Sequence, residues 1–63
     1  MTAPTKPEIA HSLRLVADHL DALAVAFDYY GGFAPWAQHA KELSGAALLA
    51  RDWATEIAAE AHE

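Results

Sequence analysis

The first half of the chain carries large apolar side chains at alternating intervals of four and three residues. The series runs from near the N-terminus to the aromatic-rich middle of the chain: Ile9, Leu13, Val16, Leu20, Leu23, Phe27 and Tyr30. An average interval of 3.5 residues is typical of a helix that packs against another helix along one stripe. The pattern therefore predicts a helix over about residues 6–30, packed along this series.

The start of this helix is indicated by Thr5-Lys6-Pro7-Glu8. In a capping box, the Thr5 hydroxyl accepts from the Glu8 amide, and the Glu8 carboxylate accepts from the Thr5 amide. Proline is tolerated in the first turn of a helix. We expect residues 1–4 to form a frayed arm and residues 5–63 to form a single helical-hairpin domain.

A second helix is predicted over about residues 35–61. Gly31 and Gly32 are expected to end the first helix, because glycine adopts the left-handed conformation without steric cost. Pro35 suits the first turn of the next helix. A connection this short makes the two helices antiparallel neighbours, so the fold class is all-α. The side facing the first helix is mostly alanine: Trp36, Ala40, Leu43, Ala46, Ala47, Ala50, Trp53, Ala54 and Ile57.

Small residues indicate where the two helices approach closely. On the first helix, Ala10, Ala17 and Ala24 flank the large apolar series at intervals of seven. On the second, Gly45 lies inside the predicted helix, where glycine costs about 1 kcal/mol relative to alanine. We expect a close backbone approach at Gly45 to explain that cost.

The aromatic residues around the Gly-Gly pair allow two interpretations. The first is a turn closed by an aromatic plug, formed by Phe27, Tyr30, Gly31, Gly32, Phe33 and Trp36. The second is a binding site in which Tyr29, Tyr30 and Trp36 are partly exposed, since Tyr and Trp dominate binding energy at protein interfaces. The same residues can serve both purposes.

Apolar residues outside the expected helix contact predict a further interface. We assign to it Leu15, Tyr29, Leu48, Leu49 and Trp53. A second copy of the chain would cover them in an antiparallel four-helix bundle of two-fold symmetry. A different protein is the alternative, and the third possibility is a monomer that leaves them exposed.

Length and composition favour assembly. A chain of 63 residues buries too little surface for a wide margin of stability, and the absence of cysteine excludes disulfides and thiolate metal sites. The net charge of −5 argues against direct nucleic-acid binding. No apolar run reaches the roughly 20 residues of a membrane-spanning helix, and the N-terminus lacks the apolar core of a signal peptide. We therefore expect a cytoplasmic protein.

Few residues suggest chemistry. Glu8 and His11 have the Glu-x-x-His spacing found in di-iron bundles, and Glu56 and Glu60 would lie near them in a hairpin. Their position in terminal turns favours ordinary surface charges instead. No serine, cysteine or lysine stands where a histidine could activate it. We expect no enzymatic activity and no cofactor.

These observations predict a small, acidic, non-enzymatic interaction protein, acting as an adaptor, assembly factor or regulator. A narrower hypothesis is an inhibitor of the kind that phages encode, whose acidic surface blocks a basic nucleic-acid-binding site on a bacterial target. That surface would comprise Asp18, Asp21, Asp28, Glu42, Asp52 and Glu56. A metal- or ligand-binding helical bundle is another alternative, and a subunit of a larger complex with no independent fold is a third.

Overall fold

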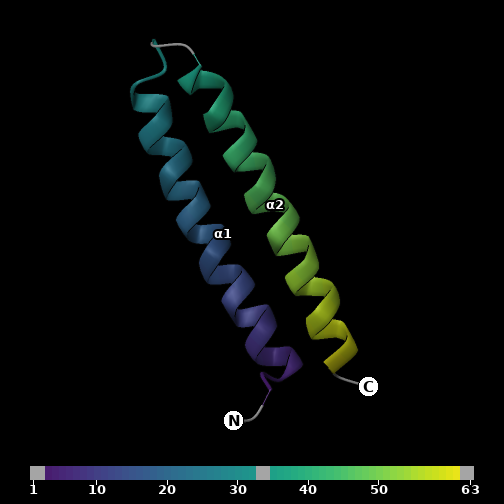
Figure 1. Ribbon diagram of the computed structural model, residues 1–63. Helices are drawn as coiled ribbons and strands as arrows, with labels where there is room; N and C mark the ends of the chain where they lie inside the picture. Colours follow the sequence, from purple (N-terminus) through teal and green to yellow (C-terminus); the bar gives the residue numbers. More distant parts are fainter. Residues whose placement is uncertain (1–2, 33–34, 62–63) are drawn as a thin grey trace.

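The chain folds into two antiparallel helices that lie side by side along their whole length (Figure 1). The computed structural model describes residues 3–32 and 35–61. Helix α1 spans Lys6–Tyr29 and helix α2 spans Trp36–Ala61, and the described residues form no strand. The start of α1 and the end of α2 lie at the same end of the hairpin (Figure 1). The prediction of an all-α helical hairpin is confirmed, with helix bounds within one residue of those expected.

Helix α1 begins with a variant of the expected cap. Thr5 has an extended backbone, and its hydroxyl accepts from the Glu8 amide at 3.3 Å. The Glu8 carboxylate was expected to accept from the Thr5 amide, but it accepts from the Thr5 hydroxyl at 3.1 Å. The hydroxyl therefore accepts one hydrogen bond and donates another, which orients both side chains at the first turn.

Helix α1 ends without a left-handed glycine, so that prediction is wrong. The Tyr30 amide donates to the Phe27 carbonyl at 3.1 Å, and the Gly31 amide donates to the Asp28 carbonyl at 2.9 Å. This three-residue spacing tightens the last turn and satisfies the terminal carbonyls. Gly31 is still required, because an added Cβ would lie 2.9 Å from the Asp28 carbonyl oxygen.

The interior of the hairpin consists of alanine side chains. On each helix, three of them recur at intervals of seven residues and face the other helix. The buried apolar residues are Ala10, Ala17, Ala24, Ala40, Ala47, Ala50 and Ala54. Because a methyl group is short, alanine at each point of contact lets the two backbones pack closely.

The large apolar series of α1 was expected to form the contact with α2. It lies beside that contact instead. Leu13 and Leu20 pack partly against the buried cluster of Ala17, Ala47 and Ala50. Val16 remains 51% exposed, and Ile9 and Leu23 are also exposed. The predicted rotation of α1 about its axis was therefore wrong by about one residue. The column of alanines next to the large series faces α2, because alanine permits the closer approach of the two helices.

Two expectations about α2 are also wrong. Trp36, Ala46 and Trp53, assigned to the inward side, are exposed to solvent. Gly45 does not mark a close approach, since no atom lies within 4 Å of the position that an added Cβ would take. The close contacts are made by alanine, so Gly45 has no packing role within the hairpin.

Candidate interaction surface

The positions of the buried alanines define which residues lie on each of the two sides of the hairpin. With Ala17 directed at α2, the neighbouring Val16 and Asp18 are each rotated by roughly 100°, to opposite sides. Arg51 of α2 donates to Asp18 at 3.0 Å and also to Asp21, so these three residues mark one side. The residues that precede the buried alanines, such as Val16 on α1, therefore lie on the other side.

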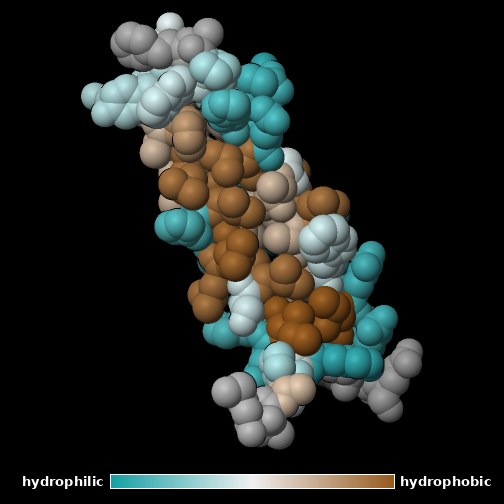
Figure 2. All heavy atoms as spheres, in the orientation of Figure 1, coloured by the Kyte–Doolittle hydropathy of each residue, from teal (hydrophilic) through white to brown (hydrophobic). Residues whose placement is uncertain are grey.

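That other side is a continuous hydrophobic surface, which we name the apolar face. Hydrophobic side chains from both helices cover most of its length (Figure 2). Its exposed large residues are Ile9, Val16, Leu23, Tyr30, Trp36, Leu49 and Trp53. Half-buried residues lie between them and the alanine contact: Leu13, Leu20, Phe27, Leu43 and Ile57.

An aromatic cluster ends the apolar face next to the turn. The ring of Trp36 lies 4.9 Å from that of Phe27 and 5.5 Å from that of Tyr30. His39 approaches Phe27 edge-on at 6.0 Å. Such separations are favourable for aromatic pairs. The structure thus brings together three residues of the expected plug, whereas Phe33 lies outside the described residues.

Both Tyr30 and Trp36 are also substantially exposed. Tyr29, which stacks edge-on against Tyr30 at 4.9 Å, is 80% exposed. The cluster therefore packs against the turn and still exposes aromatic surface, so the two interpretations of this segment share residues. Gly31 and Gly32 lie in the turn itself.

The five residues expected to form a dimer or partner interface divide between the two sides. Leu49 and Trp53 lie on the apolar face, while helical periodicity places Leu15, Tyr29 and Leu48 away from it. Ile9, Val16 and Leu23 were expected in the hairpin interior, so they were not predicted as surface residues. The signal that identifies them is the alanine repeat on both helices, which fixes the rotation of each helix.

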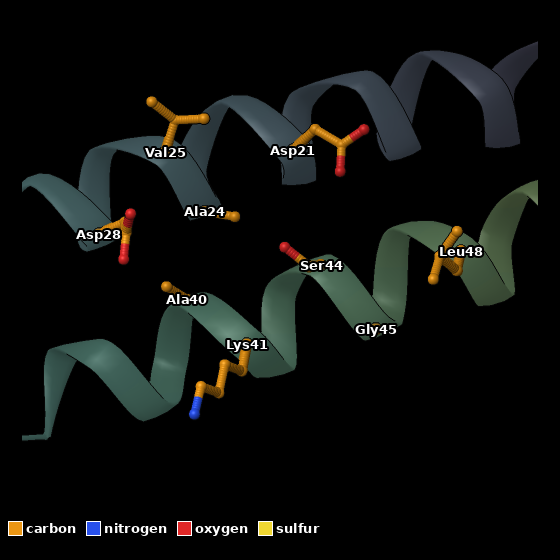
Figure 3. Close-up of a pocket in the computed structure, with 9 residues that line it drawn as sticks. All are labelled: Asp21, Ala24, Val25, Asp28, Ala40, Lys41, Ser44, Gly45 and Leu48. Carbon is orange, nitrogen blue, oxygen red and sulfur yellow. The ribbon is translucent and has the colours of Figure 1, made fainter. Parts of the chain in front are cut away.

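The opposite side holds a shallow groove between the helices (Figure 3). Its volume is about 650 Å³. Its walls carry the carboxylates of Asp21 and Asp28 on α1 and the amine of Lys41 on α2. The remaining lining is small or apolar: Ala24, Val25, Ala40, Ser44, Gly45 and Leu48.

Arg51 joins the two helices beside this groove. Hydrogen bonds to Asp21 and then Asp18 raise the pKa of the Arg51 guanidinium above its usual value. Asp21, which was assigned to the acidic surface, is half-buried and bonded across the helix contact. The charges of Asp18 and Asp21 are therefore partly neutralised within the chain.

The other acidic residues are spread around the molecule. Asp28 lines the groove, and the Glu42 carboxylate lies 3.3 Å from His39 Nδ1. Asp52 and Glu56 are exposed on α2. By helical periodicity, Glu42 and Glu56 lie along the α2 edge of the apolar face, away from the groove. Asp18, Asp21 and Asp28 therefore lie on the groove side, whereas Glu42 and Glu56 lie on the other side.

The residues suggested as metal ligands either interact with other side chains of the chain or lie on opposite sides of the hairpin. Glu8 is bonded to Thr5, and Glu60 lies 3.7 Å from the Lys6 amine. Across residues 3–32 and 35–61, no three His, Asp or Glu side chains are grouped closely enough to hold a metal ion. Periodicity places His11 on the Arg51 side, opposite Glu60. The described side chains form no candidate metal centre.

Neither α1 nor α2 has a stretch that is both long and apolar enough to cross a membrane. Comparison of the chain with protein-family models, with curated proteins and with solved structures finds no match.

Proposed function

We propose that this chain is a non-enzymatic interaction protein that pairs with a second copy of itself through the apolar face. Two hairpins joined in this way form a four-helix bundle. The outer sides, which carry most of the charged residues, then remain available to a protein partner. The continuous apolar face is the observation that supports this proposal.

The amount of exposed surface supports pairing. The accessible surface is 4830 Å² for a chain of 6.8 kDa. A compact monomer of that mass exposes about 4,000 Å². The excess is close to the roughly 800 Å² that each partner buries in a standard protein interface. Pairing through one face would bring the accessible surface per chain near the value of a compact protein.

The composition of the interior supports the same conclusion. The fully buried side chains of the hairpin are alanines, each of which removes about one methyl group from water at roughly 0.8 kcal/mol. The large side chains of the apolar face are left partly in water, where they stabilise little. A second copy would supply the missing cover and convert these residues into a core.

The narrower inhibitor hypothesis has less support. It needs a concentrated acidic surface, whereas Asp18 and Asp21 are bonded to Arg51, and Glu42 and Glu56 lie away from the groove side. The metal-binding hypothesis is likewise left aside, because Glu8 and Glu60 have partners within the chain.

Two valines on opposite sides of α1 provide a matched test. Val16 lies on the apolar face and is 51% exposed, while Val25 lies by the groove and is 73% exposed. Molar mass by light scattering, across a concentration series, should give twice 6.8 kDa for the unmodified protein. Val16→Lys should raise the dissociation constant by about a hundredfold, because two lysines enter the interface and two buried valines are lost. Val25→Lys should leave the mass unchanged.

Helicity, measured by circular dichroism on the same samples, separates loss of pairing from loss of folding. A helical monomer at all concentrations of the unmodified protein would overturn self-pairing. Equal weakening by Val16→Lys and Val25→Lys would show that the apolar face is not the interface.

A further inference from the structure

Two ways of pairing the apolar faces satisfy two-fold symmetry and keep all neighbouring helices antiparallel. If the two-fold axis runs parallel to the helices, α1 lies beside α2 of the second copy and both turns are at the same end. If the axis is perpendicular to the helices, α1 lies beside α1, α2 lies beside α2, and the turns are at opposite ends. We infer that the first arrangement is formed, an inference that rests on the proposed self-pairing.

Side-chain size favours this arrangement. The row that α1 contributes to the apolar face has a large residue at every seventh position, as in Ile9, Val16 and Leu23. The corresponding row of α2 has His39, Ala46 and Trp53, so it is smallest at its centre. Since Ala17 and Ala47 pack in one cluster, Ala46 lies at about the level of Val16.

An axis parallel to the helices preserves these levels in the second copy. It therefore sets the α1 row against the α2 row twice, with Ala46, the smallest residue of either row, opposite Val16. The perpendicular axis would set large against large at one contact and alanine against alanine at the other. Close packing favours facing rows of unequal size, because they fill the space between helices evenly.

The charges along the edges of the apolar face favour the same arrangement. The α2 edge carries Glu42 and Glu56 on either side of Leu49, and the α1 edge carries Ser12, His19 and Ala26. The perpendicular axis would bring two α2 edges together, so that each edge with Glu42 and Glu56 faces an identical acidic edge. Facing like charges oppose association. The parallel axis places each glutamate edge against an edge without acidic residues, with His19 within about one turn of the level of Glu42.

The two ends of the hairpin provide a third reason. The turn end of the apolar face is aromatic, whereas the open end carries the Lys6–Glu60 ion pair at 3.7 Å. Opposite-end pairing would place this exposed ion pair against Trp36 and Tyr30 and would remove it from water. Same-end pairing places aromatic residues beside aromatic residues. It also places Glu60 beside Lys6 of the second copy.

Distances between spin labels distinguish the two arrangements. The chain has no cysteine, so one introduced cysteine gives one labelling site per copy. Gln38 and Ala59 are exposed and lie three heptads apart on the outer side of α2, near its two ends. Labels at Gln38→Cys should lie about 20 to 25 Å apart in the inferred arrangement, because only the width of the bundle separates them. The opposite-end arrangement predicts about 35 to 40 Å, because about 30 Å of helix length then lies between the labels.

Ala59→Cys is the matched control at the open end and should also give the short distance. Dilution with excess unlabelled protein should remove the dipolar signal for both variants, which shows that it arises between copies. A long distance in a protein of dimer mass would overturn the arrangement and leave self-pairing intact. Absence of a dipolar signal together with a monomer mass would overturn both.

Discussion

Ala17 of α1 and Ala47 of α2 face each other in one buried cluster, and neither side chain is exposed to solvent. The methyl groups of these two residues lie between the helices, and their small size determines how closely the two backbones approach. A larger residue at either position has no space, since the backbones of both helices bound the contact.

Ala17→Leu should therefore destabilise the protein by about 1 to 3 kcal/mol through overpacking. Ala22→Leu is the control, because Ala22 is exposed on the same helix and leucine is also a good helix former. Thermal unfolding followed by circular dichroism measures both. Equal melting temperatures for the two variants would contradict an alanine-packed interior.

Gly45→Ala should stabilise the protein. Gly45 lies inside α2 with no atom within 4 Å of an added Cβ, so the substitution gains helix propensity without a clash. The gain should be about 0.5 to 1 kcal/mol, which raises the melting temperature by several degrees in a chain of this size.

Gly31→Ala should have the opposite effect on stability from Gly45→Ala. Its new Cβ would lie 2.9 Å from the Asp28 carbonyl oxygen, so the turn must shift. We expect this variant to melt at a lower temperature than the unmodified protein. A lower melting temperature for Gly45→Ala would instead mean that Gly45 contacts something outside the hairpin.

Arg51→Gln should lower the melting temperature, because Arg51 joins Asp18 and Asp21 of α1 to α2. A double-mutant cycle with Asp21→Asn isolates the pair, since each single variant removes the same interaction. Asp21→Asn should cost less stability in the Arg51→Gln background than alone. High salt should reduce the coupling, because the guanidinium is accessible to solvent and screened by ions.

Thr5→Ala should destabilise α1 by about 1 kcal/mol, because the hydroxyl accepts from the Glu8 amide at the first turn. Thr55→Ala is a matched control. The Thr55 hydroxyl donates to the Arg51 carbonyl inside α2, a bond that contributes little to helix stability. Urea unfolding of both variants should show a lower midpoint for Thr5→Ala alone.

Local signals in the sequence were sufficient to predict the helices. The spacing from Ile9 to Tyr30 identified α1, Thr5 located its start, and the glycines with Pro35 located the turn. Each of these depends on interactions within about four residues. The prediction of left-handed glycines failed because the i to i−3 hydrogen bonds at Tyr30 and Gly31 end the helix without them.

Helix rotation was harder to predict, because two adjacent columns of α1 could each face α2. Large apolar residues favour the column of Val16, whereas close approach favours the column of Ala17. Close approach is decisive, because the column of Ala17 packs against alanines that have the same seven-residue spacing on α2. The error moved Ile9, Val16 and Leu23 from the surface to the interior and so concealed most of the apolar face.

The hairpin is only 12 Å deep in its shortest dimension, against 47 Å in its longest. A slab of that depth is about one helix thick, so nearly every side chain outside the alanine contact reaches a surface. The interior of the hairpin then constrains the residue type at few positions. At the other positions, the residue type depends on what the surface contacts. Descendants of one ancestral chain could diverge at most positions while keeping alanine at every seventh residue of both helices. Distant kin of this protein would then be recognised by the spacing of their alanines rather than by overall sequence identity.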